Sequence, residues 1–109
     1  MPRARVISSS SVSLPNELTR ALGTNLKRLR SAAQMTQEEL AYEAEIERSR
    51  ISKLEGGYIN PSLLTLSTIC YCLGVTLSQL FEGVIANVRP VAQGGKPRRA
   101  NQAVLGKKG

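Results

Sequence analysis

The sequence predicts a single all-α domain of five helices, and three observations indicate it. The chain of 109 residues is long enough for one modest hydrophobic core. Its residues are 41% hydrophobic but only 4% aromatic, which favours packed helices over a sheet. Apolar residues recur at intervals of three and four, the period of one helix face. We therefore expect a compact five-helix domain over residues 15–85, between a flexible arm over 1–14 and a flexible basic tail over 86–109.

The first predicted helix runs over residues 15–33. Pro15 suits a first helical turn. Gly23 costs about 1 kcal/mol relative to alanine inside a helix, so it either weakens this helix or separates an N-terminal extension from it. The apolar face consists of four leucines: Leu18, Leu22, Leu26 and Leu29.

Two short helices follow. Thr36 and Glu39 have the spacing of a capping box, which predicts a helix start at this point. The inward face of this second helix carries Leu40, Ala41 and Ala44. A tight connection at Glu45 and Ile46 leads to a third helix over about 47–55, which ends at a pair of glycines.

The last two predicted helices follow turn signals. Asn60-Pro61-Ser62 starts a helix that Gly74 ends, and Thr76 caps a final short helix. The fourth helix has an expected inward face of Leu63, Leu66, Ile69, Cys70 and Leu73. No strand signal is present.

The charge is strongly basic but uneven. The net charge is +7, which suggests a polyanionic partner or serves solubility alone. Residues 21–85 carry six basic and seven acidic residues, whereas residues 86–109 carry six basic residues and no acidic one. If the polyanion is DNA, any specificity must therefore come from a few placed cations in the domain, while the tail could add sequence-independent attraction to phosphates.

Several other classes of protein are disfavoured. Cys70 and Cys72 point in different directions on a helix and cannot readily bridge, and without histidine they are too few for a closed zinc site. No nucleophile, base and orienting group form a catalytic set, so we expect no enzyme. No apolar run reaches membrane-spanning length, and no hydrophobic leader follows the first arginines. The expectation is a cytoplasmic protein without cofactor, metal or small-molecule ligand.

The third helix presents polar side chains outward. Ile51 and Leu54 face the core, which leaves Arg48, Ser49, Arg50, Ser52 and Lys53 for other contacts. A helix about 10 to 12 Å across fits the major groove of about 12 Å, where arginine, lysine and serine can bond base edges. Two short helices with a tight turn and outward cations are typical of a helix-turn-helix.

An ordered set of residues covers this motif and the helices beside it. The set is Thr36-Gln37-Glu38-Glu39-Leu40-Ala41, Ala44, Ile46, Ile51-Ser52, Leu54-Glu55, Gly57, Pro61-Ser62-Leu63, Leu66 and Leu73-Gly74-Val75. It resembles the lambda-repressor-like helix-turn-helix family of phage repressors and bacterial regulators, over about residues 22–82. Within that family, the chain is most similar to short stand-alone regulators such as restriction-modification controller proteins.

The resemblance implies a homodimer on an inverted-repeat operator. Gln37 takes the role of a phosphate contact. The base edges fall to Arg48, Ser49 and Lys53, and a phosphate or flanking contact to Arg50. The resemblance also implies a buried ion pair between the ends of the first and third helices, here Arg30 and Glu55. The chain departs from the family at Glu45, where the family often has glycine.

The dimer surface is expected around the last helix, because apolar residues remain there after the core is filled. The candidates are Leu77, Phe81, Val84, Ile85 and Val88. In the rival arrangement, residues 84–88 fold back onto their own domain and leave a monomer. The resulting hypothesis is a transcription regulator, a repressor or autoregulator, bound to double-stranded DNA. The alternative is an antitoxin-like protein-interaction module on the same fold.

Overall fold

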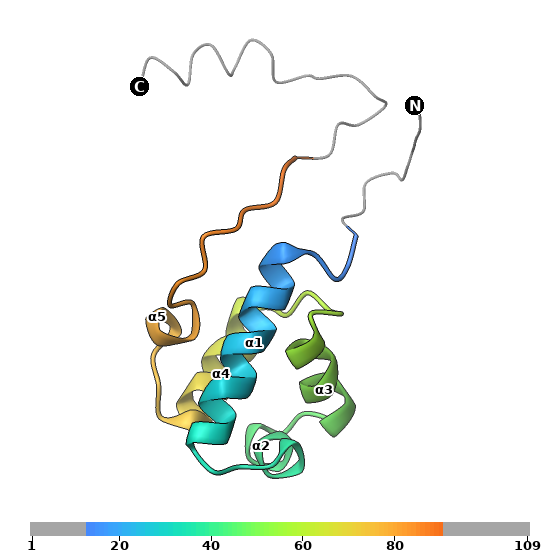
Figure 1. Ribbon diagram of the computed structural model, residues 1–109. Helices are drawn as coiled ribbons and strands as arrows, with labels where there is room; N and C mark the ends of the chain where they lie inside the picture. The colour runs from blue at the N-terminus through green and yellow to red at the C-terminus, as the bar shows by residue number, and fades with distance from the viewer. Residues whose placement is uncertain (1–12, 91–109) are drawn as a thin grey trace. The chain divides into compact units, whose positions relative to one another are not determined.

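The computed structural model describes residues 13–90, and helices form in the order that the sequence predicts (Figure 1). Within this range no strand forms, so the all-α class is confirmed. Leu14–Val88 make up one compact unit, while the predicted arm and tail lie largely outside the described residues. The helices are α1 (Glu17–Ala32), α2 (Gln37–Ala44), α3 (Arg48–Gly56), α4 (Leu63–Leu73) and α5 (Leu77–Leu80).

Helix α1 begins two residues later than predicted, because Asn16 rather than Pro15 sets its start. The Asn16 Oδ1 atom accepts a hydrogen bond from the Thr19 amide at 2.9 Å, and Thr19 Oγ1 accepts one from the Asn16 amide at 3.0 Å. This reciprocal pair is a capping box built from Asn and Thr. The capping box predicted at Thr36 and Glu39 is present, with bonds of 2.8 and 3.0 Å.

One aliphatic core receives side chains from every helix. Helix α1 lies between α3 on one side and α5 on the other (Figure 1). The most deeply buried side chains, each less than 2% exposed, are those of Leu26, Leu40, Ile51, Leu54, Ile69 and Leu80. The prediction that Leu63 belongs to this core is wrong, since its side chain is 66% exposed. Leu63 is the first residue of α4, and the buried stripe begins one turn later, at Leu66.

Gly23 marks the closest approach of α1 to α3. The helix continues through it, so no separate N-terminal extension exists. A Cβ atom at this position would overlap the backbone carbonyls of Leu54 and Glu55, at the end of α3. The glycine therefore lets the two helices pack backbone to backbone, which outweighs its low helix propensity.

The connection between α2 and α3 turns through a left-handed residue. Glu45 has φ 58° and ψ 44°, the conformation in which the side chain of an L-residue crowds its own backbone. A glycine would adopt it without that strain. This strained turn sets the direction in which α3 leaves α2.

Candidate nucleic-acid interface

One side of helix α3 packs into the core, and the other side is exposed on the surface. Ile51 and Leu54 are buried in the core, while Arg48, Ser49, Ser52 and Lys53 line one shallow depression on the surface. These four residues recur at intervals of one, three and four, so they share one face of the helix. Arg50 is also exposed, but about 100° per residue places it on the opposite flank from Arg48 and Ser52.

The depression combines the donors and acceptors that base edges require. The guanidinium of Arg48 can bond guanine with two parallel hydrogen bonds, and the ammonium of Lys53 can reach the same acceptors. The hydroxyls of Ser49 and Ser52 can donate or accept. Because the helix beneath is fixed by buried side chains, these groups project from a rigid element.

A nearly buried ion pair ties the end of α1 to the end of α3. The Arg30 Nε atom lies 2.6 Å from Glu55 Oε2, and Arg30 Nη2 donates to Glu55 Oε1 at 3.1 Å. The side chains are only 12% and 5% exposed. Arg30 Nη1 also donates to the Met35 carbonyl at 2.8 Å, in the loop before α2. The hydrogen bond and charge of Glu55 raise the pKa of Arg30 against the opposing effect of burial.

Gln37 belongs to the same network, which the sequence did not indicate. Its Nε2 atom donates to Glu55 Oε1 at 3.0 Å. An amide nitrogen has two protons, so one donor remains for another partner such as a phosphate. No local spacing links residues 37 and 55, and only the fold shows that the carboxylate orients this amide.

The apolar residues around α5 divide into two groups. Leu80 is fully buried, and Leu77 and Phe81 pack against the core while keeping part of their surface exposed. Val84 is half-buried. Ile85 is 89% exposed and Val88 42% exposed, so the exposed apolar part of the predicted dimer surface lies mainly after the helix.

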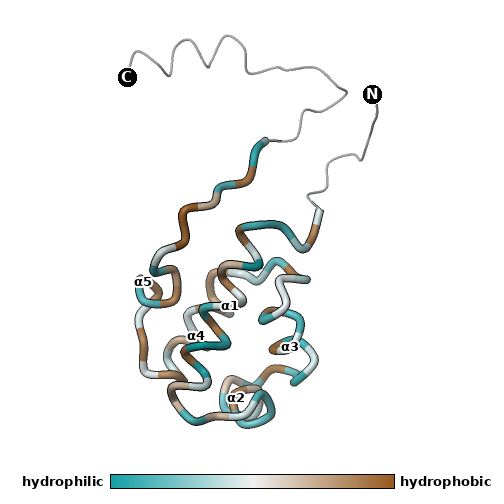
Figure 2. Tube along the Cα trace, in the orientation of Figure 1, coloured by the Kyte–Doolittle hydropathy of each residue, from teal (hydrophilic) through white to brown (hydrophobic). Residues whose placement is uncertain are grey.

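Helix α4 carries exposed apolar residues that the sequence analysis missed. Leu64 and Tyr71 are two turns apart and 78% and 86% exposed. No charged residue occurs from Gly56 to Phe81. Figure 2 agrees, with hydrophilic colour along α3 and little of it along α4. The two helices therefore offer surfaces of opposite character.

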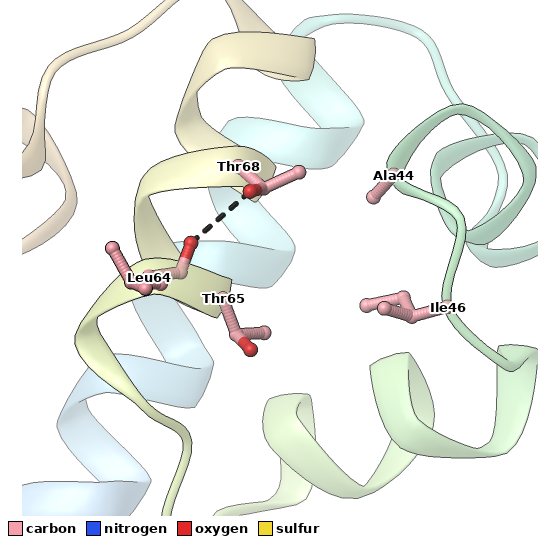
Figure 3. Close-up of a pocket in the computed structure, with 5 residues that line it drawn as sticks. All are labelled: Ala44, Ile46, Leu64, Thr65 and Thr68. Atoms are coloured by element: carbon pink, nitrogen blue, oxygen red, sulfur yellow. Dashed lines mark hydrogen bonds between the residues drawn. The ribbon is translucent and has the colours of Figure 1, made fainter.

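A small hollow lies between α4 and the turn that leads into α3 (Figure 3). Its lining consists of Ala44, Ile46, Leu64, Thr65 and Thr68. The Thr68 hydroxyl donates to the Leu64 carbonyl at 3.1 Å, a bond within α4 itself. None of these five side chains is charged, so the hollow offers no charge to a phosphate.

The cysteines of α4 contribute to packing. Cys70 is buried and Cys72 packs against the core. Burial raises the pKa of both thiols, and the charge of Glu43 adds to the effect at Cys72. The form of cysteine that binds metal is the thiolate and not the thiol. Within residues 13–90, no group of three or more potential metal ligands comes together, and no helix could span a membrane.

Comparison with known proteins identifies the family. A family model described as a helix-turn-helix domain matches residues 23–84, more than half of the chain. The control protein C.MunI of Mycoplasma is 36% identical over 70 residues, which cover 63% of this chain and 95% of that protein.

Solved structures agree with this result. The clp gene regulator ClgR from C. glutamicum superimposes with a TM-score of 0.59 and 32% identity, over 63% of this chain and 92% of that one. The restriction-modification controller protein C.AhdI from Aeromonas hydrophila gives 0.57 and 30%, over 58% and 96%. This chain therefore belongs to the helix-turn-helix domain family, and to its lambda-repressor-like branch of short regulators, as the motif predicted.

Proposed function

We propose that the protein is a homodimeric transcription regulator, a repressor or autoregulator, that reads an inverted-repeat operator in duplex DNA. The observation that carries this proposal is the rigid outward face of α3, with its two cations and two hydroxyls in one depression. The relatives support it by their names, since they are a control protein, a gene regulator and a restriction-modification controller. Groups of this kind on a helix are suited to the major groove.

Each residue has a defined role in this proposal. Arg48, Ser49 and Lys53 bond base edges, with Ser52 beside them on the same face. Gln37 donates its remaining amide proton to a phosphate, and Glu55 holds it in place. Arg50, on the far flank of α3, bonds a phosphate outside the bases that Arg48 reads.

The homodimer forms through the apolar surface around and after α5. Exposed Ile85 and Val88, with the open parts of Leu77, Phe81 and Val84, make up this surface. Two-fold pairing would bury it and set two α3 helices about 34 Å apart, one turn of duplex. The operator half-sites would then be about 10 base pairs apart.

The proposal is tested by selecting bound duplexes from a random pool and then measuring affinity against salt. We expect one inverted repeat to be enriched, with a footprint on DNA upstream of the protein's own gene if it is an autoregulator. The logarithm of the binding constant should fall linearly and steeply with the logarithm of the salt concentration, between about 50 and 200 mM salt. Failure to enrich any sequence, with no affinity at low salt, would contradict the proposal and favour a protein-interaction module.

A further inference from the structure

The ring of Tyr58 folds back onto the last turn of α3. A Cβ atom built on Gly56 would lie 2.7 Å from both Cδ2 and Cε2 of this ring. Real Cβ atoms do not approach so closely, so the ring occupies the space that a side chain at position 56 would need. The main chain from which the ring projects is fixed, because the Tyr58 amide donates to the Lys53 carbonyl at 2.9 Å across the left-handed Gly57.

Gly56 is on the same face of α3 as the base-reading residues. It follows Ser52 by four residues and Ser49 by seven, the spacing of neighbours along one side of a helix. The tyrosine ring therefore extends the outward face by one turn. At Gly56, which has no side chain, the surface of this face is formed by the ring of Tyr58.

The Tyr58 hydroxyl is available for a contact outside the protein. The residue is 60% exposed, and within residues 13–90 its hydroxyl makes no hydrogen bond. The ring lies against the last turn of the helix, and a tyrosine has few rotatable bonds to restrict, so a bond from its hydroxyl costs less entropy than one from a lysine or arginine. The site is thus a positioned neutral donor at the C-terminal end of α3.

We propose that Tyr58 is a further DNA-contact residue, whose hydroxyl donates to a backbone phosphate oxygen while Gly56 provides the seat for its ring. This inference rests on the proposed function. A recognition helix reads bases with its N-terminal residues, here Arg48 and Ser49, so the opposite end of the helix is where the strand backbone is met. A phenol is a donor that phosphate accepts, and it carries no charge.

The test compares two variants that separate the hydroxyl from its seat. Tyr58→Phe keeps the ring and removes the donor, whereas Gly56→Ala keeps the donor and displaces the ring. Because Gly56 is an ordinary residue of α3 without positive φ, alanine is accommodated by its backbone. The matched control is Tyr71→Phe, which also removes only a tyrosine hydroxyl, here from the exposed side of α4. Thermal melting confirms that each variant is folded.

Binding to a labelled duplex of mixed sequence is measured by fluorescence anisotropy at several salt concentrations. We expect Tyr58→Phe and Gly56→Ala each to weaken binding about two- to tenfold, and Tyr71→Phe to have no effect. The double variant should be no weaker than Gly56→Ala alone. The salt slope should stay the same, because no charge is removed.

Two outcomes would overturn the inference, and they are distinguishable. If the unmodified protein binds the duplex and Tyr58→Phe binds equally well, the hydroxyl makes no contact and the proposed function stands. If the unmodified protein shows no affinity even at low salt, the proposed function fails and the contact fails with it.

Discussion

Helices α3 and α4 are built alike but present opposite surfaces. Each buries one side in the same aliphatic core, and each ends at a left-handed glycine, Gly57 or Gly74. The outward side of α3 carries Arg48 and Lys53, whereas α4 carries no charged residue. The apolar pattern that makes both helices does not distinguish them. Under the proposed function, the charge of its exposed side is what suits α3, and not α4, to a polyanion.

The two helices also differ in how they are fixed. Helix α4 is held by apolar packing, mainly against α2 and α5. Helix α3 has in addition a charged anchor, because Glu55 binds both Arg30 of α1 and Gln37 of α2. Hydrogen bonds have directions that apolar contacts lack. The anchor therefore fixes the orientation of α3 relative to its neighbours, as recognition of a groove would need.

The largest expected effect concerns the side of the domain away from α3. Ile85→Asp should abolish the dimer, because it would bury an unpaired charge in the interface. Sedimentation at micromolar concentration measures the mass. The control is Leu64→Asp on α4, which is similarly exposed and should leave the dimer intact. If Leu64→Asp breaks the dimer and Ile85→Asp keeps it, the interface lies on α4 instead. If the unmodified protein is itself a monomer, the proposed homodimer is refuted.

The next effect tests the anchor of α3. Glu55→Ala leaves Arg30 nearly buried without its partner and should lower the free energy of unfolding by about 3 to 5 kcal/mol. Urea titration measures the loss. Glu43→Ala, which removes an exposed carboxylate from α2, should change it by only about 0.5 kcal/mol. A loss below about 1 kcal/mol for Glu55→Ala would mean that the pair acts like a surface salt bridge.

A smaller effect separates base reading from phosphate contact. Arg48→Ala should cost about 1 to 3 kcal/mol on the selected operator and relax the preference at one or two base pairs. Gln37→Ala should weaken all duplexes about equally. Competition among single-base operator variants measures both, with exposed Arg28→Ala on α1 as the control. An unchanged preference profile for Arg48→Ala would remove this residue from base reading.

The smallest effect concerns the turn into α3. Helices α3 and α4 end at glycine, but α2 ends at Glu45 in the same left-handed conformation. Glu45→Gly should therefore raise the free energy of unfolding by about 1 kcal/mol. Glu43→Gly, inside α2, should lower it by about as much. If both variants change the free energy of unfolding in the same direction in urea titrations, the turn is not strained.

Much of this fold follows from local sequence signals. Capping residues and apolar spacing predict where helices occur, because both act over three or four residues. The wrong predictions arise where a residue fits a local rule but its position in the folded helix or a neighbouring side chain decides otherwise. Leu63 has the right spacing for the core but lies in the first turn of α4, beyond the buried stripe. Pro15 suits a helix start, yet the side chain of Asn16 makes the cap.

The candidate site was predictable in part for the same reason. The outward residues of α3 follow from helical spacing and from resemblance to known regulators. The bond between Gln37 and Glu55 and the seat of Tyr58 on Gly56 depend on how the chain packs in three dimensions. Gly23 shows the limit well, since its sequence context left two interpretations and only its contact with the α3 backbone decides between them.

The most direct test of the account is an amide NMR titration of the isotope-labelled protein with the selected duplex. The claim is that DNA contacts α3 and the start of α2, while α4 faces away. We expect the largest chemical-shift changes over residues 48–58 and at Gln37, and small ones over residues 64–72. Changes concentrated on α4, or spread evenly over both helices, would contradict the assignment of α3 as the recognition helix.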